Sequence, residues 1–188
     1  MDNQTDREHI KNLIARDEQA YEILLDKFET PIYRFFYYSQ GNHQIAQDLS
    51  GETFARFIIA IENFKSNNSD SLKSFIYAIA RNILLENIRR KKLVQKNISF
   101  FENTPSEKPS VFREVLSPDE LEYVFNIIGQ FKESERQILV FRFIEELKIE
   151  EIACIMKMSV NSVKSKIHRS RKKLCEILSK NKSYKEEF

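Results

Sequence analysis

Seven polar or basic side chains gather on one side of a predicted helix near the carboxyl-terminal end of the chain. At about 100° per residue they lie opposite an apolar stripe, so one side of the helix can pack on a core while the other meets a partner. Lysine and arginine neutralise phosphates, and short amide or hydroxyl side chains can read base edges. The polar set is Asn161, Ser162, Lys164, Ser165, His168, Arg169 and Lys172, and the apolar stripe is Val160, Val163, Ile167, Leu174 and Leu178. This pattern predicts an interface with double-stranded DNA.

A shorter helix, over about residues 149–156, precedes this one and completes a helix-turn-helix pattern. Ser159 is a good N-cap for the second helix, because its hydroxyl can accept a hydrogen bond from a backbone N–H that has no partner within the helix. Ala153 is small at a point where the two helices must approach closely. In such a motif the second helix enters the major groove and the first crosses the backbone. A solvated basic helix would give the same charge run, so that alternative stays open for the motif alone.

Two carboxylates mark a second candidate surface on an earlier predicted helix. Asp48 and Glu52 are four residues apart, so both project from one helix face. With Phe54 and Phe57 nearby, the helix could present an acidic rim and apolar anchors to a basic partner. The alternative is an ordinary solvated helix with a buried aromatic face. The two carboxylates could also hold a metal ion of a nuclease, but no third ligand or general base stands at a sensible spacing.

A predicted helix over about residues 71–92 ends in four consecutive cations, which suit a helix carboxyl terminus and could be only a solvated end. Tyr77, Arg81 and Asn82 lie upstream and could be core or capping residues. Beside the polar loop at residues 65–70, however, these side chains would form a basic groove edged with amide and aromatic groups. Such a groove suits an unpaired DNA strand, whose bases stack and hydrogen-bond in pockets.

Composition limits the class of protein. Charged residues are 31% and hydrophobic residues 41% of 188, with only 3 Gly and 4 Pro, which indicates a soluble and mostly helical chain. The net charge of +2 is too small for a general polyanion binder, so the clustering of basic residues carries the signal. Cys154 and Cys175 lie far apart, so we expect no disulfide framework, no metal site and no cofactor. Free cysteines, a polar amino terminus and the lack of a membrane-length apolar run predict a cytoplasmic protein without direct membrane insertion.

Helical periodicity covers most of the chain, and no alternating strand pattern of any length occurs. It runs from about Asp6 to Ser39, with a break or kink expected at Pro31, and then over about residues 44–63 and 71–92. It fades from about residue 93 to residue 117, where prolines and polar residues indicate a flexible linker. We therefore predict an all-α fold of two small helical domains, residues 1–93 and 118–188, joined by a linker over 94–117. Further breaks are expected at 132–134, 148 and 158–159, and a frayed tail from Asn181.

Three segments, in order along the chain, resemble the extracytoplasmic-function sigma factors of bacterial RNA polymerase. The likeness spans about residues 20–178. Residues 45–54 look like the segment that docks on the clamp helices of the polymerase. Residues 75–82, with Arg89 and Arg90, resemble the helix that addresses the minus-ten promoter element. The helix-turn-helix is similar to the reader of the minus-thirty-five element.

The resemblance implies a promoter-specificity subunit that performs no catalysis of its own. Its partners would be core RNA polymerase (the clamp helices, and the flap through apolar residues near 131–143), promoter DNA and an anti-sigma factor. The implied polymerase contacts are Asp48, Leu49, Glu52, Phe54 and Phe57. The implied minus-ten contacts are Phe64, Asn67, Asn68, Tyr77, Arg81, Asn82, Arg89 and Arg90, with the loop at 64–71 holding a flipped base of the non-template strand. The implied minus-thirty-five contacts are the seven polar residues of the helix-turn-helix.

The sequence departs from the family's usual pattern at three positions. Gly51 stands where the family usually has Gln, Phe75 where a Trp is common, and Lys157 where the turn often has Gly. A mid-helix glycine costs about 1 kcal/mol relative to alanine, and a lysine with positive φ carries a modest penalty. A stand-alone helix-turn-helix repressor or activator is the rival hypothesis, although nothing in the sequence suggests a ligand pocket.

Overall fold

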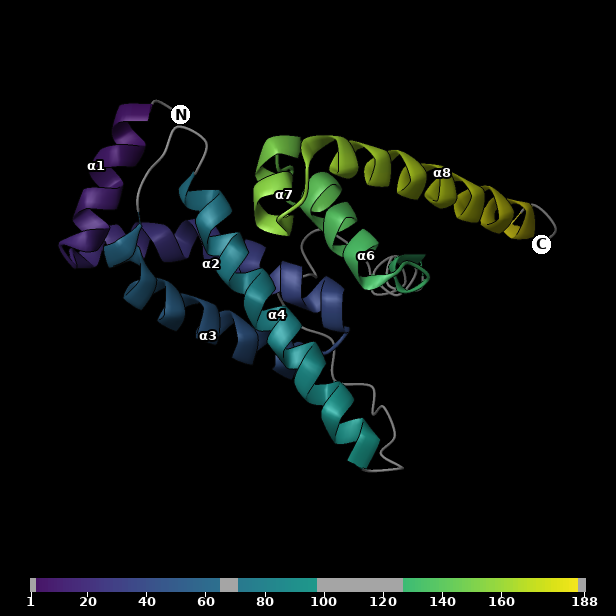
Figure 1. Ribbon diagram of the computed structural model, residues 1–188, viewed down its shortest axis with the longest axis horizontal. Helices are drawn as coiled ribbons and strands as arrows, with labels where there is room; N and C mark the ends of the chain where they lie inside the picture. The colour runs from purple at the N-terminus through teal and green to yellow at the C-terminus, as the bar shows by residue number, and fades with distance from the viewer. Residues whose placement is uncertain (1–2, 65–70, 98–126, 186–188) are drawn as a thin grey trace. The chain divides into compact units, whose positions relative to one another are not determined.

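The computed structural model describes residues 3–64, 71–97 and 127–185, and every regular element within these ranges is a helix (Figure 1). The chain divides into two compact units, Met1–Lys108 and Pro109–Phe188. The all-α class and the two helical domains are therefore confirmed. Most of the predicted linker lies outside the described residues, but helix α4 continues to Asn97, a few residues into that range.

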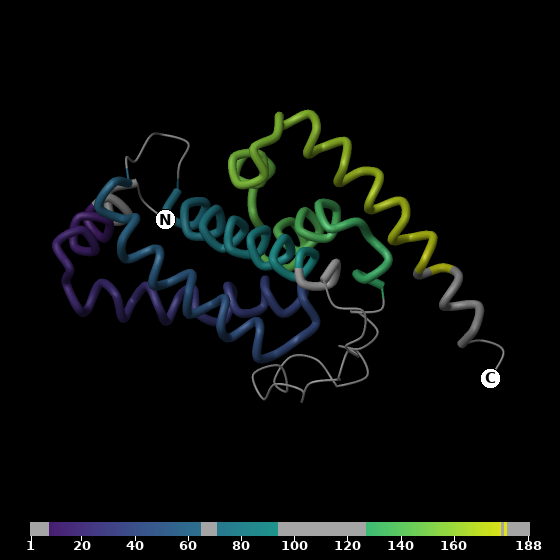
Figure 2. The backbone as a smooth tube through the Cα atoms, turned by 60° about the horizontal axis from the view of Figure 1, so that its bottom comes forward, coloured from purple at the N-terminus to yellow at the C-terminus, as the bar shows by residue number. Residues whose placement is uncertain are grey.

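Unit 1 is built from α1 (Asn3–Ile14), α2 (Glu18–Gln40), α3 (His43–Ala60), the short 3-10 helix η1 (Ile61–Asn63) and α4 (Leu72–Asn97). Helix α2 packs against both α3 and α4, α3 also packs on α4, and α1 closes against α2 and η1 (Figure 2). Large apolar side chains with no exposed surface fill the space between these helices. They include Leu13, Leu24, Ile32, Phe35, Phe36, Phe57, Ile61, Ile76, Tyr77, Ile83 and Leu84.

The amino-terminal periodicity is interrupted at Arg16 and Asp17, and of the break or kink predicted at Pro31 the break does not occur. Arg16 takes a left-handed conformation at φ 61°, and the Asp17 carboxylate accepts the Ala20 N–H at 2.9 Å to cap α2. Helix α2 then continues through Pro31, although an interior proline costs about 3 kcal/mol. The neighbouring Phe28 and Ile32 are both buried, and their tertiary packing offsets that cost.

Gly41 and Asn42 turn the chain between α2 and α3. Gly41 lies at φ 67° and donates its N–H to the Tyr37 carbonyl at 2.8 Å, which closes the last turn of α2. The Asn42 side chain accepts the Ile45 N–H at 2.9 Å and so caps α3. This turn sets the antiparallel approach of α3, the helix that carries the predicted polymerase contacts.

Unit 2 contains α6 (Glu133–Leu139), the π-helical turn η3 (Val140–Ile144), α7 (Ile149–Met156) and α8 (Val160–Lys185). The starts of these helices confirm the breaks predicted at 132–134, 148 and 158–159. In α6 and α7, the third helical residue is a glutamate, Glu135 or Glu151, that accepts the backbone N–H of the residue before the helix, at 3.3 and 2.8 Å. The expected frayed tail from Asn181 was wrong in its start, because α8 runs on to Lys185.

Helix α8 packs against the rest of unit 2 at two places along its length. Its first half packs on α7, and Val163 there has no exposed surface. Farther along, Leu174 and Ile177 pack against a buried cluster of Ile127, Phe131 and Leu139. Val160, Ile167 and Leu174 are half-buried, so these members of the predicted stripe face inward, whereas the side chain of Leu178 lies outside the described residues. The opposite side of α8 is therefore held in a fixed orientation by two separate cores.

Candidate nucleic-acid interface

The turn between α7 and α8 is fixed by hydrogen bonds at both helix ends. Lys157 takes the left-handed conformation (φ 53°, ψ 49°), as its place in the motif predicted. Its N–H donates to the Cys154 carbonyl at 3.1 Å, and the Met158 N–H donates to the Ala153 carbonyl at 3.0 Å, a Schellman cap. Ser159 then accepts the Ser162 N–H at 3.2 Å, which confirms the predicted N-cap. These bonds set the angle between the two helices.

All seven polar residues predicted to contact duplex DNA are exposed on the first turns of α8. Asn161, Ser162, Ser165 and Arg169 also line a groove of about 310 Å³, together with Met158 and Lys166. The guanidinium of Arg169 donates a long hydrogen bond to the Ser165 carbonyl, at 3.4 Å, which orients the side chain. The groove is therefore lined by hydroxyl, amide and cationic groups.

Two other lysines of α8 are used inside unit 2. Lys173 donates to the Gln130 carbonyl at 2.5 Å and lies over the Phe131 ring, 4.6 Å from its centroid. Lys166 reaches Ser134 of α6 at 3.5 Å. These contacts hold α8 against the start of α6, so Lys166 and Lys173 are tied within unit 2, whereas the seven residues of the polar set stay exposed.

The residues predicted to address an unpaired strand separate into buried and exposed groups. Tyr77 has no exposed surface and makes an edge contact with Phe35 at 6.1 Å between ring centroids, so it supports the fold. Arg81 is half-buried, and burial lowers the pKa of its guanidinium. Phe64 is half-buried against Phe75, with 4.6 Å between centroids. Asn82, Arg89 and Arg90 are exposed on α4. Asn67 and Asn68 lie outside the described residues.

The sequence models of two sigma-factor regions match this chain. Sigma-70 region 2 matches residues 24–94, which include α3 and most of α4, and Sigma-70 region 4 matches residues 121–174, which include the helix-turn-helix. Together the two ranges cover more than half of the chain. The chain belongs to the sigma-70 family of sigma factors.

Its relatives place it among the extracytoplasmic-function (ECF) sigma factors, and two relatives match over nearly their whole length. The sigma factor is 29% identical over 177 residues to the ECF RNA polymerase sigma factor SigW of Bacillus subtilis, covering 89% of this chain and 94% of that one. It is 28% identical over 182 residues to the RNA polymerase sigma-H factor of Pseudomonas aeruginosa, covering 92% and 93%. These likenesses favour a sigma factor, which binds RNA polymerase and promoter DNA to initiate transcription, over a stand-alone regulator.

Solved structures share the fold of this sigma factor. CnrH, in complex with the cytosolic domain of CnrY, matches with a TM-score of 0.69 at 18% identity, covering 93% of this chain and 97% of that one. The sigma factor RpoE of Bartonella quintana, in complex with the anti-sigma factor NepR, matches with a TM-score of 0.71 at 19% identity, covering 85% and 96%.

Only part of the acidic face predicted to meet the polymerase is available on α3. Asp48 is exposed and accepts a hydrogen bond from Gln44 at 3.0 Å. Leu49 and Phe57 are buried in the core of unit 1, and Phe54 is half-buried. The buried pair therefore supports this face of the sigma factor from beneath.

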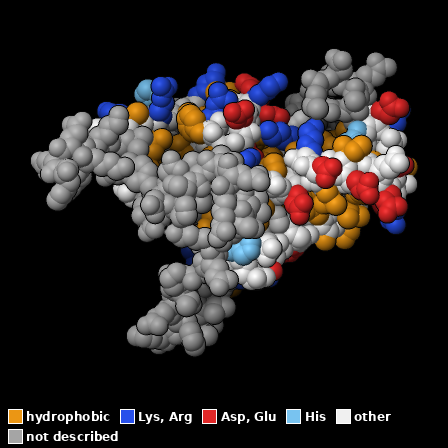
Figure 3. All heavy atoms as spheres, turned by 180° about the vertical axis from the view of Figure 1, so that it is seen from behind, with side chains coloured by type: hydrophobic (Ala, Val, Ile, Leu, Met, Phe, Trp, Pro, Cys, Tyr) orange, Lys and Arg blue, Asp and Glu red, His pale blue; other side chains and the backbone are white. Residues whose placement is uncertain are grey.

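The sequence reasoning missed an exposed apolar residue on the same face of α3. Ile59 is 74% exposed and lies on the helix side that carries Asp48 and Glu52. Its spacing from those carboxylates, at seven and eleven residues, was a readable signal. Figure 3 shows that hydrophobic side chains reach the surface beside acidic ones on the face that it draws. This face of α3 therefore combines the exposed carboxylate of Asp48 with the exposed side chain of Ile59.

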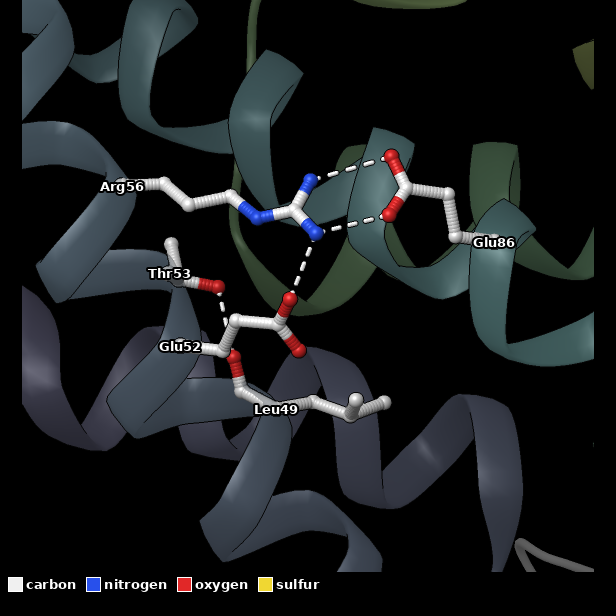
Figure 4. Close-up of polar contacts among 5 residues, drawn as sticks. All are labelled: Leu49, Glu52, Thr53, Arg56 and Glu86. Atoms are coloured by element: carbon white, nitrogen blue, oxygen red, sulfur yellow. Dashed lines mark hydrogen bonds and ion pairs between the residues drawn. The ribbon is translucent and has the colours of Figure 1, made fainter.

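Glu52 is already paired, because the Arg56 guanidinium bridges it to α4 (Figure 4). Arg56 donates to Glu52 at 2.5 Å and to both carboxylate oxygens of Glu86 at 3.0 and 2.7 Å. The hydrogen bond from Arg56 is the main reason that the pKa of Glu86 is lowered, and the same bond raises the pKa of Arg56. The spacing of Glu52 and Arg56 is visible in the sequence, but their link to Glu86, thirty residues away, is a tertiary feature.

A second groove follows this bridge between α3 and α4. Its volume is about 320 Å³. It is lined by Arg56, Ala60, Ile79, Asn82, Leu85, Glu86 and Arg89. The groove joins the bridge to the exposed polar residues of α4, so the charge of Glu86 bears directly on what α4 can bind.

Within the described residues, no group of three or more histidine, cysteine, aspartate or glutamate side chains is placed to hold a metal ion. Cys154 and Cys175 are both exposed, and no disulfide joins them. In the part of the chain that the structure describes, no helix combines the length and hydropathy needed to cross a membrane.

Proposed function

We propose that the two units of this sigma factor read two promoter elements through named surfaces. Unit 2 contacts the duplex minus-thirty-five element through the outer side of α8, and unit 1 holds the melted minus-ten element through the exposed end of α4 and the loop before it. The observation that carries the proposal is the exposure of the seven-residue polar set on α8, above a helix-turn-helix whose turn is capped at both ends.

On α4 the proposed strand contacts are Asn82, Arg89 and Arg90, with Asn67 and Asn68 contributing from the loop. Tyr77 and Phe64 act through packing, since one is buried and the other is stacked against Phe75. Arg81 is half-buried beside them and contributes from the edge. An unpaired strand suits this surface, because its phosphates need cations and its bases need amide groups and apolar surfaces.

The polymerase clamp docks on α3 through Asp48 and Ile59, with Phe54 at the edge, and the flap docks on unit 2 through Phe143. Phe143 is 51% exposed, whereas Phe131 and Phe141 are buried. The protein performs no catalysis of its own, and strand opening draws on binding energy within the holoenzyme. Two weak readers on one scaffold gain specificity through their effective concentration at a promoter.

The proposal extends to a cytoplasmic location and to control by an anti-sigma factor. The RpoE structure described above is a complex with an anti-sigma factor, which supports such control here. Co-purification of the tagged protein from its own cells, followed by transcript mapping, would identify the core enzyme, the inhibitor and the promoter together.

The duplex contact is tested by the salt dependence of holoenzyme binding to the mapped promoter. Arg169→Ala should weaken binding and lower the slope of log affinity against log salt by about one, because one phosphate contact is lost. Lys132→Ala removes an exposed lysine elsewhere in unit 2 and should leave the slope unchanged. An unchanged slope in Arg169→Ala would remove this residue from the phosphate contacts.

Docking on the clamp is tested by titrating the protein against core polymerase. Ile59→Asp should weaken association at least tenfold, since it places a charge at the centre of the proposed contact. Ile23→Asp is the matched control, because Ile23 is 57% exposed on α2. Equal affinity of the Ile59→Asp variant and the unchanged protein would place the clamp elsewhere.

A further inference from the structure

Glu86 lies within the basic, carboxyl-terminal half of α4. After Arg56, the charges of Arg90 and Arg89 are the causes that lower its pKa, so these cations lie close to it. Asn82 and Arg89 share the groove with it. A bare carboxylate at this position would repel the phosphates of a DNA strand lying along α4.

Arg56 neutralises that carboxylate from the neighbouring helix. Its planar guanidinium meets both oxygens of Glu86 at 3.0 and 2.7 Å, the two-pronged geometry in which arginine binds a carboxylate most specifically. The same guanidinium also meets Glu52 at 2.5 Å (Figure 4). One cation therefore neutralises two carboxylates, of which Glu86 lines the groove.

Stability alone does not account for this arrangement. The three side chains are 40%, 34% and 41% exposed for Arg56, Glu52 and Glu86, and ion pairs with this exposure contribute little to folding. These ion pairs have a larger effect on the charge of the groove than on stability. Without Arg56 the groove lining would keep the carboxylate of Glu86 beside the cation of Arg89, and Glu52 would lose its ion pair.

We propose that Arg56 is a positioning residue for promoter DNA, which holds Glu86 and Glu52 masked so that the basic end of α4 can accept the melted strand. Arg56 acts through the carboxylates and does not itself contact a phosphate. This inference rests on the proposed function, in which α4 binds the strand.

The test measures how holoenzyme binds a fluorescent single strand that carries the minus-ten region of the mapped promoter, with core polymerase saturated by the sigma factor. Arg56→Gln should weaken binding about three- to tenfold, because one uncompensated charge is left near a phosphate. Adding Glu86→Gln to that variant should restore affinity to within about twofold, although the bridge is still absent. Glu86→Gln alone should bind at least as well as the unchanged protein.

Salt dependence separates masking from direct contact. The slope of log affinity against log salt should be unchanged in Arg56→Gln, whereas loss of a direct phosphate contact would lower it by about 0.7 for a single strand. Arg16→Gln breaks the exposed pair with Glu62 elsewhere in unit 1 and should bind normally. Arg56→Lys keeps the charge without the planar fork, so its affinity for the single strand should lie between those of the unchanged protein and of Arg56→Gln. This variant keeps the inference testable if Arg56→Gln folds poorly.

Two outcomes would overturn the inference. A double variant as weak as Arg56→Gln, or a reduced salt slope, would show that Arg56 acts directly or through the fold. Arg89→Ala separates this failure from failure of the proposed function. If Arg89→Ala binds normally, the strand does not lie on this part of α4. If Arg89→Ala weakens binding while Arg56→Gln does not, the strand lies on α4 but Arg56 does not act by masking the carboxylates.

Discussion

Replacing Gly51 by alanine should stabilise unit 1, because this glycine stands inside α3 without a structural need for its flexibility. It is exposed, and a Cβ added there meets no atom within 4 Å. The unfolded chain loses less entropy on folding with alanine, which contributes about 0.5–1 kcal/mol in a helix interior. For a unit of this size, that corresponds to a rise in Tm of roughly 2–8 °C.

Gly41→Ala is the matched control with the opposite sign. A Cβ there also meets no atom within 4 Å, but Gly41 holds φ 67° at the end of α2, where alanine is strained by about 1 kcal/mol. The pair therefore differs in backbone conformation and not in packing. One variant should melt above the unchanged protein and the other below it.

The tyrosine near-ultraviolet signal is a suitable measure, because Tyr21, Tyr33, Tyr37, Tyr38 and Tyr77, five of the seven tyrosines, lie in unit 1. A lower Tm for Gly51→Ala would refute the reasoning and would mean that α3 departs from regular helix at this position. A higher Tm together with lost polymerase binding would place the backbone of Gly51 against the polymerase.

Two further substitutions test local features of each unit. Lys157→Gly should stabilise unit 2 by about 0.5–1 kcal/mol by relieving the left-handed strain in the turn, whereas Lys164→Gly, inside α8, should destabilise it by about 1 kcal/mol, as measured by urea unfolding followed at 222 nm. Glu86→Gln should flatten the loss of stability in acid. Because Arg56 lowers the pKa of Glu86 below 4.5, the unfolded chain binds the proton more readily, so the contribution of Glu86 is present above about pH 4.5 and is lost as the pH falls through the folded value. The difference in Tm between Glu86→Gln and the unchanged protein should thus narrow between about pH 5 and pH 3. The change should be small, because Glu86 is partly exposed. A difference in Tm that stays constant over this range would contradict the prediction.

Local chemistry made much of the fold predictable. Ser159, Lys157 and the polar positions of α8 follow from capping and helical periodicity, which depend on residues only a few positions apart. The break at Arg16 was missed because the apolar period continues across it. The break predicted at Pro31 is the opposite case, because the packing of α2 overrides the strong tendency of proline to end a helix.

Burial explains which site predictions changed. Leu49, Phe57 and Tyr77 fit the family's motif, yet periodicity alone could not show that each points into the core of unit 1. Ile59 was overlooked because, although its spacing places it on the side of α3 that carries Asp48 and Glu52, an isoleucine in a helix is more often buried than exposed. The bridge from Arg56 to Glu86 could not be predicted, because it depends on how α3 packs on α4.

Promoter-dependent run-off transcription tests the central claim most directly. Core polymerase with this sigma factor should initiate at the mapped promoter, whereas core enzyme alone should not. Changing either promoter element should reduce initiation, and the free sigma factor should bind the duplex weakly. Tight binding of the free protein to duplex DNA, with no promoter-dependent initiation on any genomic fragment, would contradict the account.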